Sequence, residues 1–411
     1  MTPFLIPEVL REILLHIANP CELSGTYSIE GLRALYPCIF VNRQWCRIAI
    51  PILWSQPFLF GNEIDYIPII SMYLKCLEPQ DIKSLLNQGI DISLMTDYNQ
   101  MQLGVENKKP MFNYPGFLRV LYYEQMIIAI ESWCIELADI MEQQQPEQQQ
   151  PDCDDYCIDE ENNENNVTLA DNAEEIMMKT LLQLCLKYGS RLYGLHINPN
   201  TVENTNDEMY DILLTDDQLK DLVSPVRSLH IYALFKKIDV YKMLTQRCHK
   251  IEHLYISDLW ARHCDEKSVV SLGEIITSLI SSQNALVSFS LTFCKAYTRV
   301  FIPPLKLHSS TLRYIRFDKV DFKGCDPWHS IAECQNIELL EVFQCRNLEE
   351  EMVGPVTKAR FGKHFEVRYV SANNNNKKFR DWVNKVSGGA VGNICGEKLN
   401  IGKGLFALLS V

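Results

Sequence analysis

A short apolar pattern recurs along the second half of the chain and restricts the folds open to it most strongly. The pattern places large apolar residues at the first, fourth and sixth of six positions. Its copies are Leu192/Leu195/Ile197, Val226/Leu229/Ile231, Ile251/Leu254/Ile256, Leu286/Phe289/Leu291, Leu312/Ile315/Phe317 and Ile337/Leu340/Val342. The alternation of the fourth and sixth positions predicts a strand with one buried face in each copy.

The spacing of these copies indicates how the strands are arranged. Between their middle residues the intervals are 34, 25, 35, 26 and 25 residues. Three of these fall within the 20–29-residue period of leucine-rich repeats, and the longer two leave room for an extra helical turn or loop. We expect an irregular leucine-rich repeat solenoid, with helices such as 270–281 covering the convex side. The alternative is an ordinary α/β domain with unrelated buried strands, because consensus Asn turns are mostly absent.

The residues between the apolar positions predict a binding surface. On each strand they point away from the core, onto the concave face where repeat arrays generally bind partners. Aromatic and Arg side chains on a rigid scaffold suit the recognition of a protein. The predicted target-binding residues are His230, Tyr232, Tyr255, Ser290, Arg316, Asp318 and Phe343. We expect His196, Ser257, Ser288, Arg313, Glu338 and Glu341 on the same face.

The first sixty residues carry a different, helical pattern. Apolar residues at three- and four-residue spacing from Leu5 to Ile17 predict an amphipathic helix, with Pro7 in its first turn and Asn19-Pro20 after its end. A second apolar stretch runs from Leu32 to Trp54. Its large apolar residues exceed what so small a helical unit can bury, so we expect leftover apolar surface that docks another protein.

Three segments of this region resemble the F-box motif. They are Leu5–Leu14, with Ile-Pro for the usual Leu-Pro pair; Tyr36–Cys46, with Val-Asn-Arg-Gln-Trp; and Ala49–Trp54, which ends in Leu-Trp. The resemblance implies binding to the Skp-type adaptor of an SCF ubiquitin ligase, although the loop 21–29 is longer than in a minimal F-box. The adaptor-binding residues it implies are Leu5, Pro7, Val9, Leu10, Ile13, Leu14, Val41, Trp45 and Leu53. Alternatively, these residues form the core of a helical cap on the repeats.

The expected fold class is therefore α/β, with a small N-terminal helical F-box followed by an irregular leucine-rich repeat solenoid.

Short helices are expected in the middle of the chain, at 67–77 and 79–89. Two further segments, Tyr114–Leu118 and Ser132–Cys134, resemble segments of a large fungal F-box family. The expected domains are an F-box (1–60), a helical junction with a first irregular repeat (61–141), a disordered acidic Gln/Asn-rich insertion (142–175), the repeat array (176–355) and a C-terminal segment without assignment (356–411).

Charge and cysteine usage limit the partners and the compartment. The net charge is −13, and 142–175 holds twelve Asp and Glu, so the remainder balances to −13 + 12 = −1. Without clustered Lys and Arg, we expect neither nucleic acid nor membrane as a partner. Cysteines scattered through apolar patterns, and an N-terminus unlike a signal peptide, favour the cytoplasm or nucleus. The longest apolar stretch, Leu118–Met141, contains three Glu residues, so no transmembrane helix is expected.

No sequence motif predicts catalysis or a cofactor. Gly396–Gly404 lacks the spacing of a phosphate-binding loop, and Cys248, His249, His253 and Cys264 lack the paired cysteines typical of a zinc site. We therefore expect no cofactor, no metal and no enzymatic activity of the chain itself. The predicted function is a non-catalytic, substrate-recognition subunit of an SCF-type ubiquitin ligase acting in ubiquitin-dependent degradation. The alternative is a leucine-rich repeat interaction scaffold without ligase association.

Overall fold

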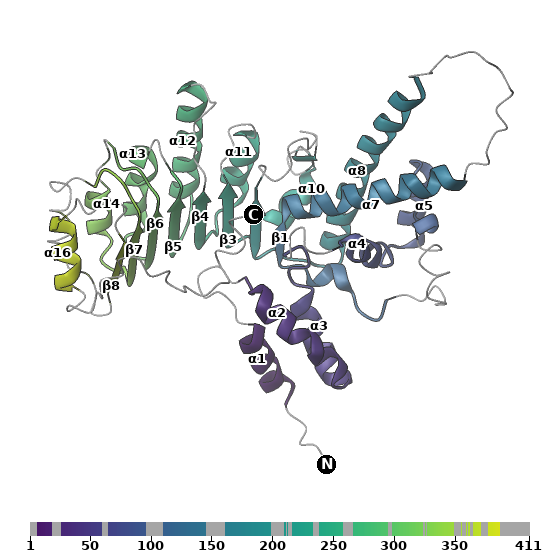
Figure 1. The fold of residues 1–411 in the computed structure, drawn as a ribbon, viewed down its shortest axis with the longest axis horizontal. Helices are drawn as coiled ribbons and strands as arrows, with labels where there is room; N and C mark the ends of the chain where they lie inside the picture. The colour runs from purple at the N-terminus through teal and green to yellow at the C-terminus, as the bar shows by residue number, and fades with distance from the viewer. Residues whose placement is uncertain are drawn as a thin grey trace. The chain divides into compact units, whose positions relative to one another are not determined.

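The apolar copies form strands of a parallel sheet in a computed structural model of the chain (Figure 1). The structure describes residues 6–18, 26–59, 65–95, 110–144, 161–198, 209–210, 212, 216–232, 238–257, 266–294, 298–323, 325, 327–348, 355, 359, 361, 365–370 and 377–386. The chain divides into two units. The first comprises Met1–Leu15, Ala34–Arg191 and Val202–Leu222, and the second comprises His16–Arg33, Leu192–Thr201 and Val223–Val411. The fold is mixed α/β, as the sequence predicted.

The sheet of the second unit keeps the order of the chain. Its parallel strands are β2 (Gly194–Ile197), β3 (Ser228–Tyr232), β4 (His253–Ser257), β5 (Ser288–Thr292), β6 (Tyr314–Asp318), β7 (Leu339–Phe343) and β8 (Glu366–Val370). The register aligns the middle residues of all the apolar copies, from Leu195 beside Leu229 to Ile315 beside Leu340. Each apolar residue of the pattern is at most 1% exposed. The copies are therefore equivalent structural units with one continuous buried face.

A recurring backbone contact fixes the start of each strand. The carbonyl of Tyr193, just before β2, accepts the N–H groups of Arg227 (2.8 Å) and Ser228 (2.9 Å) from the next copy. The carbonyl of Arg227 likewise accepts the N–H groups of Glu252 (2.8 Å) and His253 (2.9 Å). The same contact recurs at Glu252, Val287 and Arg313. Because the same pair of hydrogen bonds joins each copy to the next, the strands keep one register although the segments that connect them differ in length.

Helices connect successive strands of this sheet. They include α11 (Ile238–Arg247), α12 (Glu266–Ser281), α13 (Thr298–Phe301), the 3₁₀ helix η5 (Pro303–His308) and α14 (Trp328–Glu333). Because the strand order never reverses, crossovers of one hand place all the connecting helices on one face of the sheet, and Figure 1 shows α11 to α14 behind the strands. Their apolar residues, such as Leu244, Ile276 and Ile331, are fully buried. The opposite face of the sheet is not covered by these helices, and it carries the polar and aromatic side chains of the alternate strand positions.

A buried glutamine joins the helix layer to the sheet. The side-chain oxygen of Gln283, just after α12, accepts the backbone N–H of Ile251 at 2.9 Å. Its amide nitrogen donates to the carbonyls of Cys248 at 2.8 Å and Leu279 at 2.7 Å. The amide thus satisfies backbone groups that would otherwise be buried without partners.

The sheet extends beyond the boundary predicted from the sequence. Strand β8 pairs with β7, with Val367 beside Leu340, and Val367 is 3% exposed. Helix α16 (Lys377–Val386) buries Phe379, whose ring lies 5.1 Å from that of Trp328 and 4.8 Å from that of Tyr369. The sheet therefore continues past residue 355, where the sequence pattern placed the end of the repeat array. The copy was missed because only the alternation of Val367 and Tyr369 between charged residues marks it.

The first unit is mainly helical. The N-terminal helices are α1 (Pro7–Ala18), α2 (Ile29–Leu35), η1 (Tyr36–Phe40) and α3 (Arg43–Leu53), of which α1 and α2 each cross the division between the units. They are followed by α4 (Ile67–Leu74), α5 (Pro79–Asn87), η3 (Tyr114–Phe117), β1 (Val120–Tyr122), α7 (Tyr123–Gln144) and α8 (Glu161–Lys187), while α10 (Asp217–Val223) also crosses the division. Both short helices expected at 67–77 and 79–89 are present, each ending earlier than expected.

An N-cap and an aromatic cluster position α3 within this unit. The side chain of Asn42 accepts the N–H groups of Gln44 (2.9 Å) and Trp45 (3.0 Å), which satisfies donors of the first turn. At the other end, the ring of Trp54 lies 5.8 Å from Tyr73 and 4.3 Å from Tyr114. The Val-Asn-Arg-Gln-Trp segment therefore owes its helix start to its asparagine.

Part of the segment expected to be a disordered insertion is helical instead. Helix α7 extends to Gln144 and α8 begins at Glu161, while 145–160 lies outside the described residues. The C-terminal half of α8 buries apolar residues such as Met177 and Leu181, and a helix nucleated by such packing extends readily toward its N-terminus. The predicted boundary at 175 and 176 thus falls inside α8, which belongs to the first unit.

Among the described residues, no helix has the length and apolar character needed to cross a membrane.

Candidate functional site

The candidate target-binding site lies on the face of the sheet opposite the buried apolar residues, which we term the outward face. Its central row, set by the strand register, is His196, His230, Tyr255, Ser290, Arg316, Glu341 and Arg368. The row beside it is Tyr232, Ser257, Thr292, Asp318, Phe343 and Val370. All the predicted target-binding residues fall on these two rows. The structure therefore brings them together on one surface.

Aromatic rings and imidazoles occupy the first part of the central row. The rings of His196 and His230 stack with centroids 3.9 Å apart and planes 18° apart. The ring of His230 stacks on Tyr255 at 5.2 Å and 26°, and Tyr232 lies 6.1 Å from Tyr255. Neighbouring strands about 4.8 Å apart place side chains of one row within stacking distance. We call the stretch formed by His196, Ser228, His230, Tyr232, His253, Tyr255 and Ser290 the aromatic patch.

The imidazoles of the aromatic patch are held neutral. Loss of water around His230, together with nearby His253, lowers the pKa of His230 to about 3. Desolvation and the neighbouring His230 also bring the pKa of His196 well below its usual range, and desolvation lowers the pKa of His253. Near neutral pH these side chains can donate and accept hydrogen bonds without carrying charge.

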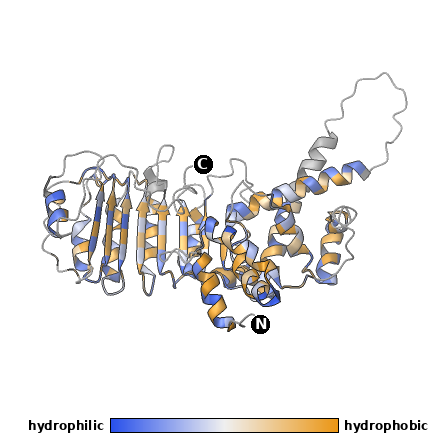
Figure 2. Cartoon of the chain, turned by 60° about the horizontal axis from the view of Figure 1, so that its bottom comes forward, coloured by the Kyte–Doolittle hydropathy of each residue, from blue (hydrophilic) through white to orange (hydrophobic). Residues whose placement is uncertain are grey.

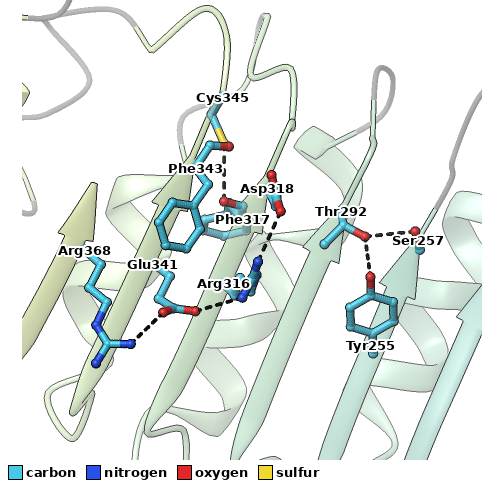
Figure 3. A network of polar contacts seen from close by, with 10 residues as sticks. All are labelled: Tyr255, Ser257, Thr292, Arg316, Phe317, Asp318, Glu341, Phe343, Cys345 and Arg368. Atoms are coloured by element: carbon cyan, nitrogen blue, oxygen red, sulfur yellow. Dashed lines mark hydrogen bonds and ion pairs between the residues drawn. The ribbon is translucent and has the colours of Figure 1, made fainter. Parts of the chain in front are cut away.

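A hydroxyl chain closes one side of the aromatic patch (Figure 3). The hydroxyl oxygens of Tyr255 and Thr292 are 2.9 Å apart, and Thr292 donates to the hydroxyl of Ser257 at 2.9 Å. Thr292 and Ser257 are buried. Burial raises the pKa of Tyr255, so its hydroxyl stays protonated. The chain fixes the position of the Tyr255 ring.

The second part of the outward face is charged but internally paired (Figure 3). Arg316 donates to Glu341 at 3.3 Å and to Asp318 at 3.2 Å. Arg368 donates to the other oxygen of Glu341 at 3.2 Å and to Glu366 at 2.7 Å. Two arginines thus pair with three carboxylates, of which those of Asp318 and Glu341 are buried. We call these residues, with Phe343, the charged patch.

The aromatic ring of the charged patch is packed, not exposed. The guanidinium carbon of Arg316 lies 5.1 Å from the ring centroid of Phe343, within reach of a cation–π interaction. Phe343 is only 8% exposed. It therefore holds Arg316 in place and offers little surface to a partner, unlike the exposed aromatic contact expected from the sequence.

Polar atoms of the aromatic patch lack partners among the described residues. They are the hydroxyl oxygens of Ser228 and Ser290 and Nδ1 of His253. Ser228 is fully buried, and it lies beside His253 in the strand register. Buried polar groups are normally hydrogen-bonded, so an unpaired group calls for a water or a ligand. The charged patch shows no such atoms within the described residues.

Two residues expected on the outward face lie elsewhere. Arg313 and Glu338 each precede a strand, β6 and β7, and pair with each other at the strand-start edge. Glu338 also accepts the hydroxyl of Tyr314 at 3.1 Å. Ser257 and Ser288 do face outward but are buried. The alternation predicted the correct face only within the strands, because the chain turns at their ends.

One row of residues at the other end of the strands was missed. Phe293, Lys319 and Gln344 each follow a strand with φ of 50°, 54° and 49°, a left-handed conformation that non-glycine residues seldom adopt. Their N–H groups donate to the carbonyls of Asp318, Phe343 and Val370 at 2.9, 2.8 and 2.7 Å. The ammonium of Lys319 also lies 4.3 Å from the Phe293 ring centroid. The usual Gly or Asn is absent, so the sequence carried no signal of this turn.

The predicted adaptor-binding residues separate into exposed and buried sets. Val9, Ile13 and Val41 are exposed, as is Pro7. Trp45 and Leu53 are half-buried, and Leu5 lies outside the described residues. Leu10 and Leu14 are fully buried, so in this structure they pack in the core and not at the surface. Leu10 and Leu14, four residues apart, lie on the buried side of α1, which the resemblance alone did not distinguish from the exposed side.

Other exposed apolar residues accompany Val9, Ile13 and Val41. Ile6 is 62% exposed and, with Val9 and Ile13, forms a stripe at three- and four-residue spacing on α1; Figure 2 shows the hydrophobic colour along this helix. Phe40 is 71% exposed, and its ring meets that of Tyr36 edge-on at 5.5 Å. We term Ile6, Val9, Ile13, Tyr36, Phe40 and Val41 the exposed apolar set.

The described residues offer no group of three or more His, Cys, Asp or Glu side chains that could hold a metal ion. Cys248, one of the cysteines considered for a zinc site, donates its thiol to the carbonyl of Val223 at 3.5 Å. Burial raises the pKa of Cys248 to about 12, which opposes the thiolate that zinc binding requires. Cys264 lies outside the described residues.

Comparison with known proteins finds no family model and no curated protein that matches the chain.

Proposed function

We propose that the chain is a substrate-recognition subunit of an SCF-type ubiquitin ligase. Its N-terminal helices bind the Skp-type adaptor, and its outward face binds the target protein. The observation that carries the proposal is the exposed apolar set, because its residues fall within or beside the segments that resemble the F-box motif. Val9, Ile13 and Val41 are both exposed and implied by that resemblance.

The energetics of the exposed apolar set favour a stable protein partner. Ile6, Phe40 and Val41 each leave more than half of their surface exposed. Covering apolar surface contributes roughly 25 cal/mol per Å², and clustered exposed apolar side chains mark interaction sites. Arg11 and Glu12, both exposed on α1, supply the polar rim usual around such a contact.

Features of the second unit support the leucine-rich repeat interpretation. The consensus of such repeats places Asn or Cys three residues after the last apolar position of the six. Cys294, Val320 and Cys345 occupy that place and are buried. The thiol of Cys345 donates to the carbonyls of Phe317 at 3.6 Å and Phe343 at 3.3 Å, as a turn-capping side chain does. At Cys345 the thiol therefore makes a turn contact of the kind that the consensus asparagine makes, which supports the repeat interpretation.

In this proposal the chain performs no bond chemistry. It holds the target near a ubiquitin-charged enzyme supplied by other subunits, which raises the effective concentration of the reacting groups. A rigid surface suits that task because little conformational entropy is lost when it binds. The paired charges of Arg316 and Glu341 and the hydroxyl chain at Tyr255 provide that rigidity.

The test is co-purification of the full-length chain with the Skp-type adaptor. Replacing Val9→Asp together with Ile13→Asp should weaken adaptor association by roughly a hundredfold or more, because each charge would be buried without a partner in the contact. The matched control is Ile135→Asp, an equally apolar residue that is 62% exposed on α7; it should bind as the unmodified chain does.

A folded Val9/Ile13 variant that still co-purifies with the adaptor would contradict the proposed docking surface. If the unmodified, folded chain never associates with the adaptor, the scaffold alternative replaces the ligase proposal.

A further inference from the structure

We propose that the target is recognised at the aromatic patch, which binds an uncharged segment of the target containing an aromatic side chain, without need of phosphorylation. This inference rests on the proposed function and deepens it. It assigns recognition to strands β3 to β5 and gives the charged patch a structural role. Three observations of the outward face support it.

The first observation is the set of polar atoms left without partners. The hydroxyls of Ser228 and Ser290 and Nδ1 of His253 have no hydrogen bond within the described residues. All three belong to the aromatic patch, on adjacent strands. Ser290 and His253 are half-buried, so a rotation of either side chain presents its unpaired atom to a backbone or neutral polar group of a bound segment, whereas Ser228 is fully buried. Leaving such groups unpaired costs about 1–3 kcal/mol each. The aromatic patch therefore has unmet hydrogen-bonding capacity.

The second observation is that the charged side chains of the outward face are already paired with one another. On the outward face, the described arginines are Arg316 and Arg368, and each is paired with carboxylates. A phosphate or an acidic segment would have to displace Glu341 from both. A basic segment would compete for Asp318 and Glu341, which are already bound and nearly buried. Both arginines and the two buried carboxylates are thus already paired, and the one further carboxylate, Glu366, lies on β8, away from the aromatic patch. An uncharged segment is therefore the complementary ligand of the aromatic patch.

The third observation is the stacked rings. His230, Tyr232 and Tyr255 each keep part of their surface exposed. Stacking within the row and the hydroxyl chain fix these rings before binding. Planar rings held in place are favourable contacts for another aromatic side chain, worth about 0.5–1.5 kcal/mol per pair beyond the buried area.

The experiment probes the full-length chain, with the Skp-type adaptor present in the sample, with a displayed library of short random peptides. Selected peptides should be enriched in aromatic residues and poor in Asp and Glu. Replacing Tyr255→Ala should weaken their binding roughly tenfold or more, as for an aromatic hot-spot residue. Tyr314→Ala is the matched control, because Tyr314 is a half-buried tyrosine of the same face on β6, outside the aromatic patch; it should change binding less than about twofold.

A second variant keeps the test independent of folding defects. Ser290→Glu places a negative charge at a half-buried position of the aromatic patch, and it should abolish peptide binding while the thermal unfolding midpoint stays close to that of the unmodified chain. Synthetic copies of a selected tyrosine peptide, with and without phosphate, complete the design. The phosphorylated copy should bind more weakly.

Selection of acidic or phosphorylated peptides, absence of any selected peptide, or full binding by Tyr255→Ala would overturn the inference. Adaptor co-purification, measured on the same samples, separates the two proposals. If the adaptor binds and the peptides behave otherwise than expected, only the inference fails. If the peptides bind as expected and the adaptor does not, the proposed function fails and the aromatic patch stands as a binding site.

Discussion

The N-terminal helices and the outward face of the sheet present opposite chemistry to a partner. In the exposed apolar set, more than half of the surface of Ile6, Phe40 and Val41 is exposed. The outward face instead buries much of its own polar surface through pairs such as Arg316 with Glu341. Permanent protein contacts are more apolar than exchangeable ones. The difference is what the proposed function requires, which is a lasting adaptor contact at one surface and an exchanging target at the other.

Substitutions on the buried and exposed sides of α1 should differ in their effect on the free energy of unfolding. Leu14→Ala should lower the free energy of unfolding by about 3 kcal/mol, because it removes a fully buried side chain and leaves a cavity. Val9→Ala, on the exposed side, should change it by less than about 0.5 kcal/mol. Urea unfolding of both variants checks this. Equal losses would show that the two sides of α1 do not differ, and the exposed apolar set would lose its basis.

The charged patch should behave as a structural network. Glu341→Ala removes one of the two carboxylates that pair with Arg316, whose side chain is 19% exposed, and should lower the free energy of unfolding by about 2 kcal/mol. Arg368 is half-exposed, so its loss of contact is largely offset by water. The control Glu366→Ala, at an exposed carboxylate, should cost less than about 0.5 kcal/mol. If Glu341→Ala is no worse than Glu366→Ala in urea unfolding, the charged patch does not stabilise the sheet.

The aromatic patch should make stability depend on pH in a defined direction. The pKa of His230 is lowered to about 3 in the folded chain, against about 6.5 when unfolded. Between these values the unfolded chain binds the extra proton, so the stability contributed by neutral His230 is full above about pH 6.5 and falls as the pH falls toward 3. Compared with His230→Phe, which keeps a ring in the stack, the unmodified chain should lose about 1 kcal/mol more between about pH 6 and about pH 5.

Urea unfolding of both chains across that range measures this difference. Parallel pH profiles of the two chains would mean that His230 is not held neutral by its surroundings. The carboxylates and the other histidines are common to both chains, so their titration cancels in the comparison to first order.

Much of the sheet could be predicted from residue patterns alone. Leu229, Leu254 and Phe289 were assigned to the buried face because strand side chains alternate, and the structure confirms that assignment. The same alternation placed His230, Tyr255 and Arg316 on the outward face. The prediction failed where the pattern weakened. Val367 was missed, and Arg313 was assigned to the outward face although β6 begins only at the next residue, Tyr314.

What the sequence by itself determined is the set of local choices that a period dictates: the strands at each apolar copy, the amphipathic helix α1 and the face on which each strand side chain lies. Only the tertiary structure decided which side of α1 is buried and which charges pair. Arg316 and Glu341 are 25 residues apart and Glu341 and Arg368 are 27 apart, and they meet only because parallel register brings them together. Such contacts depend on the geometry of the whole sheet, which no local pattern contains.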